Sequence, residues 1–131
     1  MKNIKKFLNS IYLGDRFCEK MEIRDDKIIL QINCISRLEE GAKEWNYYSQ
    51  KDIQHGCLVF AGVTEYSFNS ELLFNDEIYE IQVTGKEDNI YSFVIYGCNM
   101  SNEAVSTDIE LRIKAKEFYI LSPIDKSVVK E

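Results

Sequence analysis

The stretch that most constrains the fold runs from Ile109 to Leu121, the longest alternating segment of the chain. In its first half, apolar side chains at odd positions alternate with charged side chains at even positions: Ile109, Leu111, Ile113 and Ala115 against Glu110, Arg112, Lys114 and Lys116. A period of two residues predicts a β-strand with one buried and one exposed face. Beyond Lys116 the phase changes, because Phe118 and Ile120 occupy even positions. A bulge or sharp bend near Lys116-Glu117 is therefore expected.

The rest of the chain shows one helical pattern followed by several strand patterns. Apolar residues at positions 4, 7, 8, 11 and 12 share one helical face. They predict an amphipathic helix over about 3–13, with Asn3 as N-cap and Gly14 as a left-handed C′ residue. Gly62 indicates a bulge, and the polar tail from Asp125 is expected to fray. Strands are expected over about 18–24, 28–36, 57–68, 77–84, 90–97 and 108–121.

This order of elements sets the fold class. A helix followed by strands joined mainly as hairpins excludes an alternating βαβ arrangement. We expect a mainly β protein with a single curved antiparallel sheet or half-barrel of about six strands. One N-terminal amphipathic helix would cover part of a face or an edge. The length of 131 residues and the apolar content of 45% predict a single domain over residues 1–131.

The cysteines and the N-terminus predict the compartment. The four cysteines form no CxxC pair, and the chain has one histidine, His55. Cysteines spread over separate strands are typical of free buried thiols in a reducing compartment, with a disulfide or a metal site as the alternative. No apolar run near the N-terminal lysines is long enough for a signal peptide or a membrane span. We expect a cytoplasmic protein with no membrane association, no metal and no cofactor.

Charge is unevenly distributed along the chain. Residues 38–111 carry three basic and fourteen acidic side chains, whereas residues 1–37 and 112–131 have net charges of +3 and +2. Such a surface disfavours nucleic acid as a partner, because phosphate binding needs clustered Lys and Arg. It suits a basic protein partner, although acidic side chains that simply maintain solubility are the alternative. The basic side chains of the 109–121 strand are expected to pair with the protein's own carboxylates.

The strongest binding signal lies in the irregular, acidic stretch between positions 37 and 56. Trp and Tyr often anchor protein interfaces, although here they could instead seal the core beneath a long loop. The candidate partner-binding residues are three aromatic and four acidic side chains: Trp45, Tyr47, Tyr48, Glu39, Glu40, Glu44 and Asp52. Gly14, Asp15 and Arg16 are expected to form a structural junction between the helix and the sheet.

The sequence predicts no catalytic residue. Cys57 lies two residues after His55, but no Ser-His-Asp or Cys-His arrangement, phosphate loop or zincin motif can be assigned. The chain is therefore expected not to be an enzyme. Two alternatives remain. One is a ligand-binding or enzymatic β-domain that uses Asp15, Arg16, His55 and Tyr48 on the concave face of the sheet. The other is an oligomeric module joined through an exposed strand edge.

Four short segments carry a resemblance to known proteins: Ile11–Arg16, Trp45–Tyr48 with Asp52-Ile53, Leu58–Phe60 with Val63, and Asn75–Ile78. Together they resemble small bacterial proteins of uncharacterised function, some of which are similar to immunity proteins of polymorphic toxin systems. The resemblance implies an all-β fold with an N-terminal helix and a role in binding. We therefore expect a small cytoplasmic protein-binding module, a monomer or weak homodimer, with neutralisation of a basic toxin as its specific role.

Overall fold

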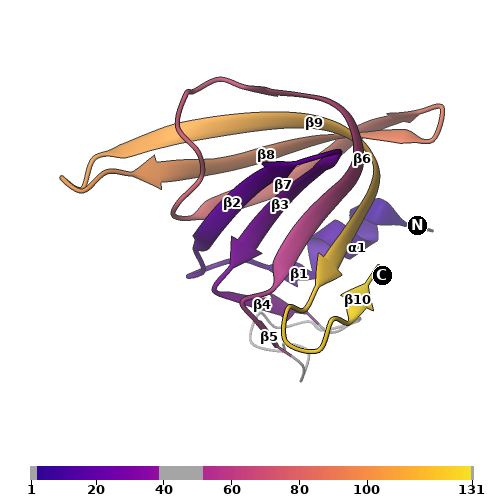
Figure 1. Ribbon diagram of the computed structural model, residues 1–131, viewed down its shortest axis with the longest axis horizontal. Helices are drawn as coiled ribbons and strands as arrows, with labels where there is room; N and C mark the ends of the chain where they lie inside the picture. The colour runs from indigo at the N-terminus through magenta and orange to yellow at the C-terminus, as the bar shows by residue number, and fades with distance from the viewer. Residues whose placement is uncertain (1–2, 39–51, 131) are drawn as a thin grey trace.

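The computed structural model describes residues 3–38 and 52–130, and it shows a mainly β protein with one N-terminal helix in the described part (Figure 1). The predicted fold class is thereby confirmed. The elements in chain order are α1 (Ile4–Ser10), β1 (Ile11–Tyr12), β2 (Cys18–Arg24), β3 (Lys27–Ile32), β4 (Cys34–Arg37), β5 (Ile53–Gln54), β6 (Cys57–Phe68), β7 (Ile78–Glu87), β8 (Ile90–Met100), β9 (Ser106–Leu121) and β10 (Val128–Val129).

The large sheet is antiparallel throughout and strongly curved (Figure 1). Its strand order is β2-β3-β6-β9-β8-β7, and β10 pairs with the end of β9. The C-terminal tail thus returns to the sheet, which corrects the expectation that it frays. Among the described residues the sheet does not close, since β2 and β7 are its edge strands. At one point the gap is bridged, where the N–H of Cys18 donates to the carbonyl of Asp76 at 2.8 Å.

The concave face of the sheet is filled with buried aromatic side chains. Phe60, Phe93 and Phe118 form a triangle with ring centroids 5.0 to 6.0 Å apart. Phe7 of α1 packs onto Phe118 at 5.5 Å, and Leu8 of the same helix is also buried. The helix therefore covers part of the concave face of the sheet, which is one of the two placements that the sequence left open, and its stability comes from this packing.

The bend predicted in the last long strand is present. Lys116 and Glu117 are both exposed, so the alternation of β9 skips one position there. Opposite them, Gly62 of β6 has φ of +65°, and a Cβ at this position would lie 2.9 Å from the Cβ of Lys116. The β6–β9 register shifts just beyond it, between Val63 and Glu65. Both central strands therefore bend at the same level of the sheet.

The predicted helix over 3–13 is too long at its C-terminal end. Asn3 does cap the helix, since its side chain accepts a main-chain hydrogen bond at 3.0 Å. The helix ends at Ser10, however, because the next two residues form β1 and pair with β4. Gly14 is therefore not the C′ residue, and the left-handed backbone falls instead at Asp15, with φ of 57°. Pairing between strands has overridden the helical periodicity.

The strand predicted over 28–36 is interrupted at Asn33. Its first part, β3, belongs to the large sheet, and its second part, β4, belongs to a separate three-stranded sheet of β1, β4 and β5. Asn33 bonds to two other segments instead of continuing the ladder. Its N–H donates to the carbonyl of Phe17 at 3.1 Å, and its carbonyl accepts from the N–H of His55 at 3.0 Å. The break leads the chain from one sheet into the other.

Candidate protein-binding surface

Most of the predicted partner-binding residues lie outside the described residues. These are Glu39, Glu40, Glu44, Trp45, Tyr47 and Tyr48. Asp52 is described, and it is exposed immediately before β5. An interface built on that stretch therefore stays a prediction.

The predicted junction at Gly14, Asp15 and Arg16 connects the end of β1 to β4. The Nη2 of Arg16 donates to the buried hydroxyl of Ser36 at 3.0 Å, and the guanidinium lies 5.7 Å from the centre of the Tyr12 ring. The Nε of Arg16 is buried and has no hydrogen-bond partner among the described residues. A side chain at Gly14 would collide with the Tyr12 ring, with 2.6 Å from its Cβ to the Tyr12 hydroxyl.

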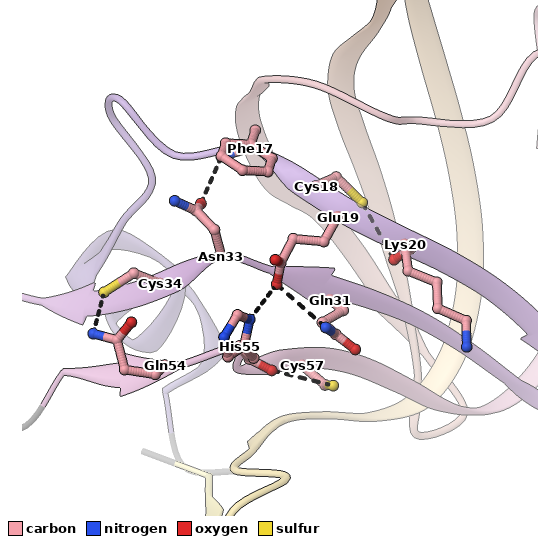
Figure 2. A network of polar contacts seen from close by, with 10 residues as sticks. All are labelled: Phe17, Cys18, Glu19, Lys20, Gln31, Asn33, Cys34, Gln54, His55 and Cys57. Carbon is pink, nitrogen blue, oxygen red and sulfur yellow. Dashed lines mark hydrogen bonds and ion pairs between the residues drawn. The ribbon is translucent and has the colours of Figure 1, made fainter.

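His55 belongs to a polar network that joins β2, β3 and the turn before β6 (Figure 2). One carboxylate oxygen of Glu19 accepts from the Nδ1 of His55 at 2.7 Å and from the Nε2 of Gln31 at 3.2 Å. A carboxylate can only accept, so Nδ1 carries the proton. The hydrogen bond from His55 holds the pKa of Glu19 below its usual value. No described contact connects this network to Arg16.

The cysteines near His55 are not arranged as nucleophiles. The thiol of Cys57 points to the main-chain carbonyl of His55 at 3.9 Å and not to the imidazole. Burial raises the pKa of Cys57 and raises that of Cys18 to about 12, so both remain protonated at neutral pH. All four cysteines are unpaired. Within the described ranges, no group of three or more His, Cys, Asp or Glu side chains could hold a metal ion.

The contact between His55 and Glu19 makes stability depend on pH. Because the pKa of Glu19 is lowered in the folded protein, the contact stabilises the fold above about pH 4.5 and is lost as the pH falls through the folded value. We expect His55→Asn, which tolerates the left-handed backbone at this position, to cost less than about 1 kcal/mol at pH 7. Urea unfolding should show this difference at pH 7 and a smaller one at pH 3. Equal differences at both pH values would contradict the assignment.

Five large apolar side chains are exposed at one end of the molecule. They come from the residue immediately before β2, the loop between β6 and β7, and the β8–β9 hairpin, at the left of Figure 1. The exposed fractions of these side chains range from 37% to 58%. Burial of their apolar surface away from water would be favourable in free energy. The five residues are Phe17, Leu72, Leu73, Met100 and Val105.

Asparagine side chains fasten the loop between β6 and β7 to this end. Asn75 forms two hydrogen bonds with the main chain of Met100, at 2.7 and 3.0 Å, as a neighbouring strand would. Asn99 donates to the carbonyl of Leu73 at 2.7 Å. The bond from Cys18 to Asp76 then joins the start of β2 to the same loop. The exposed apolar side chains therefore belong to segments that are held together.

Five carboxylates come from the segments that carry these apolar side chains or from residues next to them. The segment 69–111 contains one basic residue, Lys86, which lies in β7 near the hairpin at the opposite end of the molecule (Figure 1). Within the described residues, none of the five carboxylates at the apolar end has an ion-pair partner. We call the acidic end the five apolar residues above together with Glu71, Asp76, Glu77, Glu103 and Asp108.

The basic side chains of β9 behave differently from the carboxylates of the acidic end. Arg112 pairs with Glu110 at 3.0 Å, and Lys114 pairs with Glu65 at 2.8 Å. The sequence predicted that these basic side chains pair with the protein's own acidic residues, and for Arg112 and Lys114 the structure agrees. Arg112 and Lys114 on the exposed face of β9 are thus paired with carboxylates of the same molecule.

Reasoning from the sequence missed the acidic end. Its signals were the adjacent Leu72 and Leu73 in an otherwise polar loop, and the absence of Lys and Arg from positions 69–85 and 87–111. Neither signal could show that the loop, the hairpin and the start of β2 meet. The network around Glu19 was missed for a similar reason, since His55 and Glu19 are 36 positions apart.

Comparison with known proteins places the chain in a family. No curated protein and no solved structure matches it. In the part of the chain that the structure describes, no helix is long and apolar enough to cross a membrane. Residues 1–129, nearly the whole length, match the model of a family of unknown function, DUF6258. The chain is therefore a member of the DUF6258 family.

Proposed function

We propose that this protein is a protein-binding module whose acidic end binds a basic protein partner. The observation that carries the proposal is the combination of exposed apolar side chains with carboxylates that have no described ion-pair partner. Specific interfaces commonly consist of an apolar centre within a polar rim. Exposed apolar groups that lie close together are uncommon on a surface without a binding role.

The charge of the acidic end selects the class of partner. Carboxylates repel phosphate, which disfavours nucleic acid. A second copy docked through the same surface would bring like charges together, because a two-fold interface uses the same patch on both chains. A basic protein would neutralise the carboxylates and bury the apolar side chains. Its association should be accelerated at low ionic strength.

In its specific form, the proposal is that the partner is a toxin with a basic surface and that this chain is its immunity protein. The resemblance carried by segments such as Asn75–Ile78 supports this form, and Asp76 and Glu77 of that segment belong to the acidic end. A cytoplasmic location belongs to the same proposal, because four free cysteines suit a reducing compartment. Blocking a basic surface needs no catalytic group in this chain.

Charge reversal at the acidic end tests the proposal. We expect Glu71→Lys with Glu103→Lys to abolish co-purification of the toxin-like product of an adjacent gene. Asp26→Lys with Glu87→Lys is the matched control: it changes the net charge equally, from −6 to −2, at exposed positions away from the acidic end. The control should retain the partner.

Two outcomes would contradict the proposal. One is equal loss of binding in both double variants, since that would indicate a response to net charge alone. The other is the absence of any complex between the wild-type chain and the products of its neighbouring genes. Where a complex forms, its dissociation constant should rise with salt concentration for both the wild type and the control variant.

A further inference from the structure

We propose that Phe17 is the anchor of the acidic end, that Asn33 positions it, and that an arginine side chain of the partner stacks on its ring. This inference rests on the proposed function and names the contact by which the basic partner is recognised. Phe17 is the one aromatic residue among the five exposed apolar side chains of the acidic end. Aromatic side chains and arginine are both enriched at the centres of protein interfaces.

A single residue holds both main-chain polar groups of Phe17. The N–H of Phe17 donates to the Oδ1 of Asn33 at 2.8 Å, and its carbonyl accepts from the N–H of Asn33 at 3.1 Å (Figure 2). In an antiparallel pair of strands, the main-chain carbonyl of the opposite residue would accept the first of these bonds. The carbonyl of Asn33 already accepts from the N–H of His55 at 3.0 Å, so the side-chain amide oxygen takes its place.

The two residues after Phe17 are fixed as well. The N–H of Cys18 donates to the carbonyl of Asp76 at 2.8 Å, and the carboxylate of Glu19 accepts from His55 at 2.7 Å. The ring of Phe17 is therefore exposed on a backbone that is already ordered. Because an aromatic side chain has only two torsions to restrict, such an anchor loses little conformational entropy when a partner binds.

The charges next to Phe17 select a cation as its contact. Asp15 lies two positions before Phe17 and is exposed, and the main chain of Asp76 is bonded to the residue after it. The adjacent cation is directed elsewhere, because the guanidinium of Arg16 donates to the buried hydroxyl of Ser36 at 3.0 Å. A guanidinium can stack on an aromatic face and donate to a carboxylate at the same time. An arginine of the partner therefore fits this ring.

The role of Asn33 can be measured first in the purified protein without a partner. Asn33→Ala removes the oxygen that accepts from the N–H of Phe17, whereas Asn33→Asp keeps an oxygen at the same place. By NMR-detected hydrogen exchange, the Phe17 amide should exchange at least about tenfold faster in Asn33→Ala and at the wild-type rate in Asn33→Asp. An unchanged exchange rate in Asn33→Ala would overturn the role assigned to Asn33.

Binding to the toxin-like product of an adjacent gene tests the anchor and its contact. Phe17→Ala should raise the dissociation constant at least about tenfold. Ile23→Ala is the matched control and should leave it unchanged, since Ile23 is 41% exposed against 44% for Phe17 and lies at the other end of β2. Phe17→Tyr keeps the aromatic face and should bind as the wild type does, whereas Phe17→Leu should raise the dissociation constant at least about threefold. Equal affinities of Phe17→Tyr and Phe17→Leu would overturn the stacked arginine.

A double-mutant cycle separates positioning of Phe17 from a general effect on the fold. Asn33→Ala should raise the dissociation constant by about three- to tenfold when Phe17 is present and should have no further effect in Phe17→Ala. Asn33→Asp should bind as the wild type does. Equal effects of Asn33→Ala in the two backgrounds would overturn its role as a positioning residue.

Failure of this inference and failure of the proposed function give different results. A complex that is lost in Glu71→Lys with Glu103→Lys but is unaffected by Phe17→Ala would overturn the inference and support the proposed function. The absence of any complex with the wild-type chain, or equal loss of binding in both charge-reversal variants, would overturn both.

Discussion

Phe118→Ala should cost about 3 to 5 kcal/mol of the free energy of unfolding. Phe118 is fully buried in β9 and contacts three other aromatic rings, those of Phe7, Phe60 and Phe93, at centroid distances of 5.0 to 6.0 Å. Truncation leaves a cavity at the point where α1 meets the centre of the sheet. Backbone pairing of β9 with β6 at Phe118 and with β10 from Ile120 hinders the strands from collapsing into that cavity.

Phe17→Ala is the matched control, because it removes the same atoms from a side chain that is 44% exposed. It should cost less than about 1 kcal/mol. Urea unfolding followed by intrinsic fluorescence or circular dichroism would measure both variants. Similar losses for the two would contradict the assignment of Phe118 to the centre of the core and of Phe17 to the exposed acidic end.

Gly97→Ala should have the second largest effect, about 1 to 3 kcal/mol. A Cβ on Gly97 would lie 2.8 Å from the carbonyl oxygen of Glu77 and 2.8 Å from the ring of Phe74. The carbonyl cannot easily retreat, because it accepts a hydrogen bond from the N–H of Cys98 at 3.1 Å. The substitution must therefore push the segment 74–77 away from β8 or displace the buried ring of Phe74.

Gly85→Ala is the control for this substitution, since no atom lies within 4 Å of the added Cβ. Urea unfolding should show little change for Gly85→Ala and a clear loss for Gly97→Ala. Because Asp76 and Glu77 belong to the displaced segment, Gly97→Ala should also weaken binding of a basic partner while the protein is still folded. Stability and binding both equal to those of the wild type would show that the segment shifts without cost.

Much of the large sheet could be predicted because strands such as β9 alternate buried and exposed positions over most of their length. The bounds expected for 18–24 and 57–68 match those of β2 and β6, and the skipped position at Lys116 and Glu117 is visible in the alternation itself. Such alternation shows which side chains of a strand are buried, and it can be read from the sequence of that strand alone. The bend at Gly62 was likewise readable, because the left-handed backbone there favours glycine.

The parts that could not be predicted depend on partners elsewhere in the chain. The helix ends at Ser10 because Ile11 and Tyr12 pair with a distant strand, and the break at Asn33 depends on contacts with Phe17 and His55. The acidic end is likewise formed by three segments that meet only after folding. The local sequence does not show which segments contact one another after folding. It therefore pointed to Trp45, Tyr47 and Tyr48 as binding residues and not to Leu72 and Leu73.

The pairing of β6 with β9 has a consequence for how the protein is made. The paired residues lie between 43 and 64 positions apart, from Phe68 with Leu111 to Cys57 with Leu121. During synthesis, β2, β3 and β6 emerge early, but the apolar edge of β6 has no neighbour until β9 has left the ribosome. Folding that waits for such a distant contact is slow, in the range of about milliseconds to seconds. The nascent chain is therefore most exposed to aggregation or to chaperones just before its last long strand arrives.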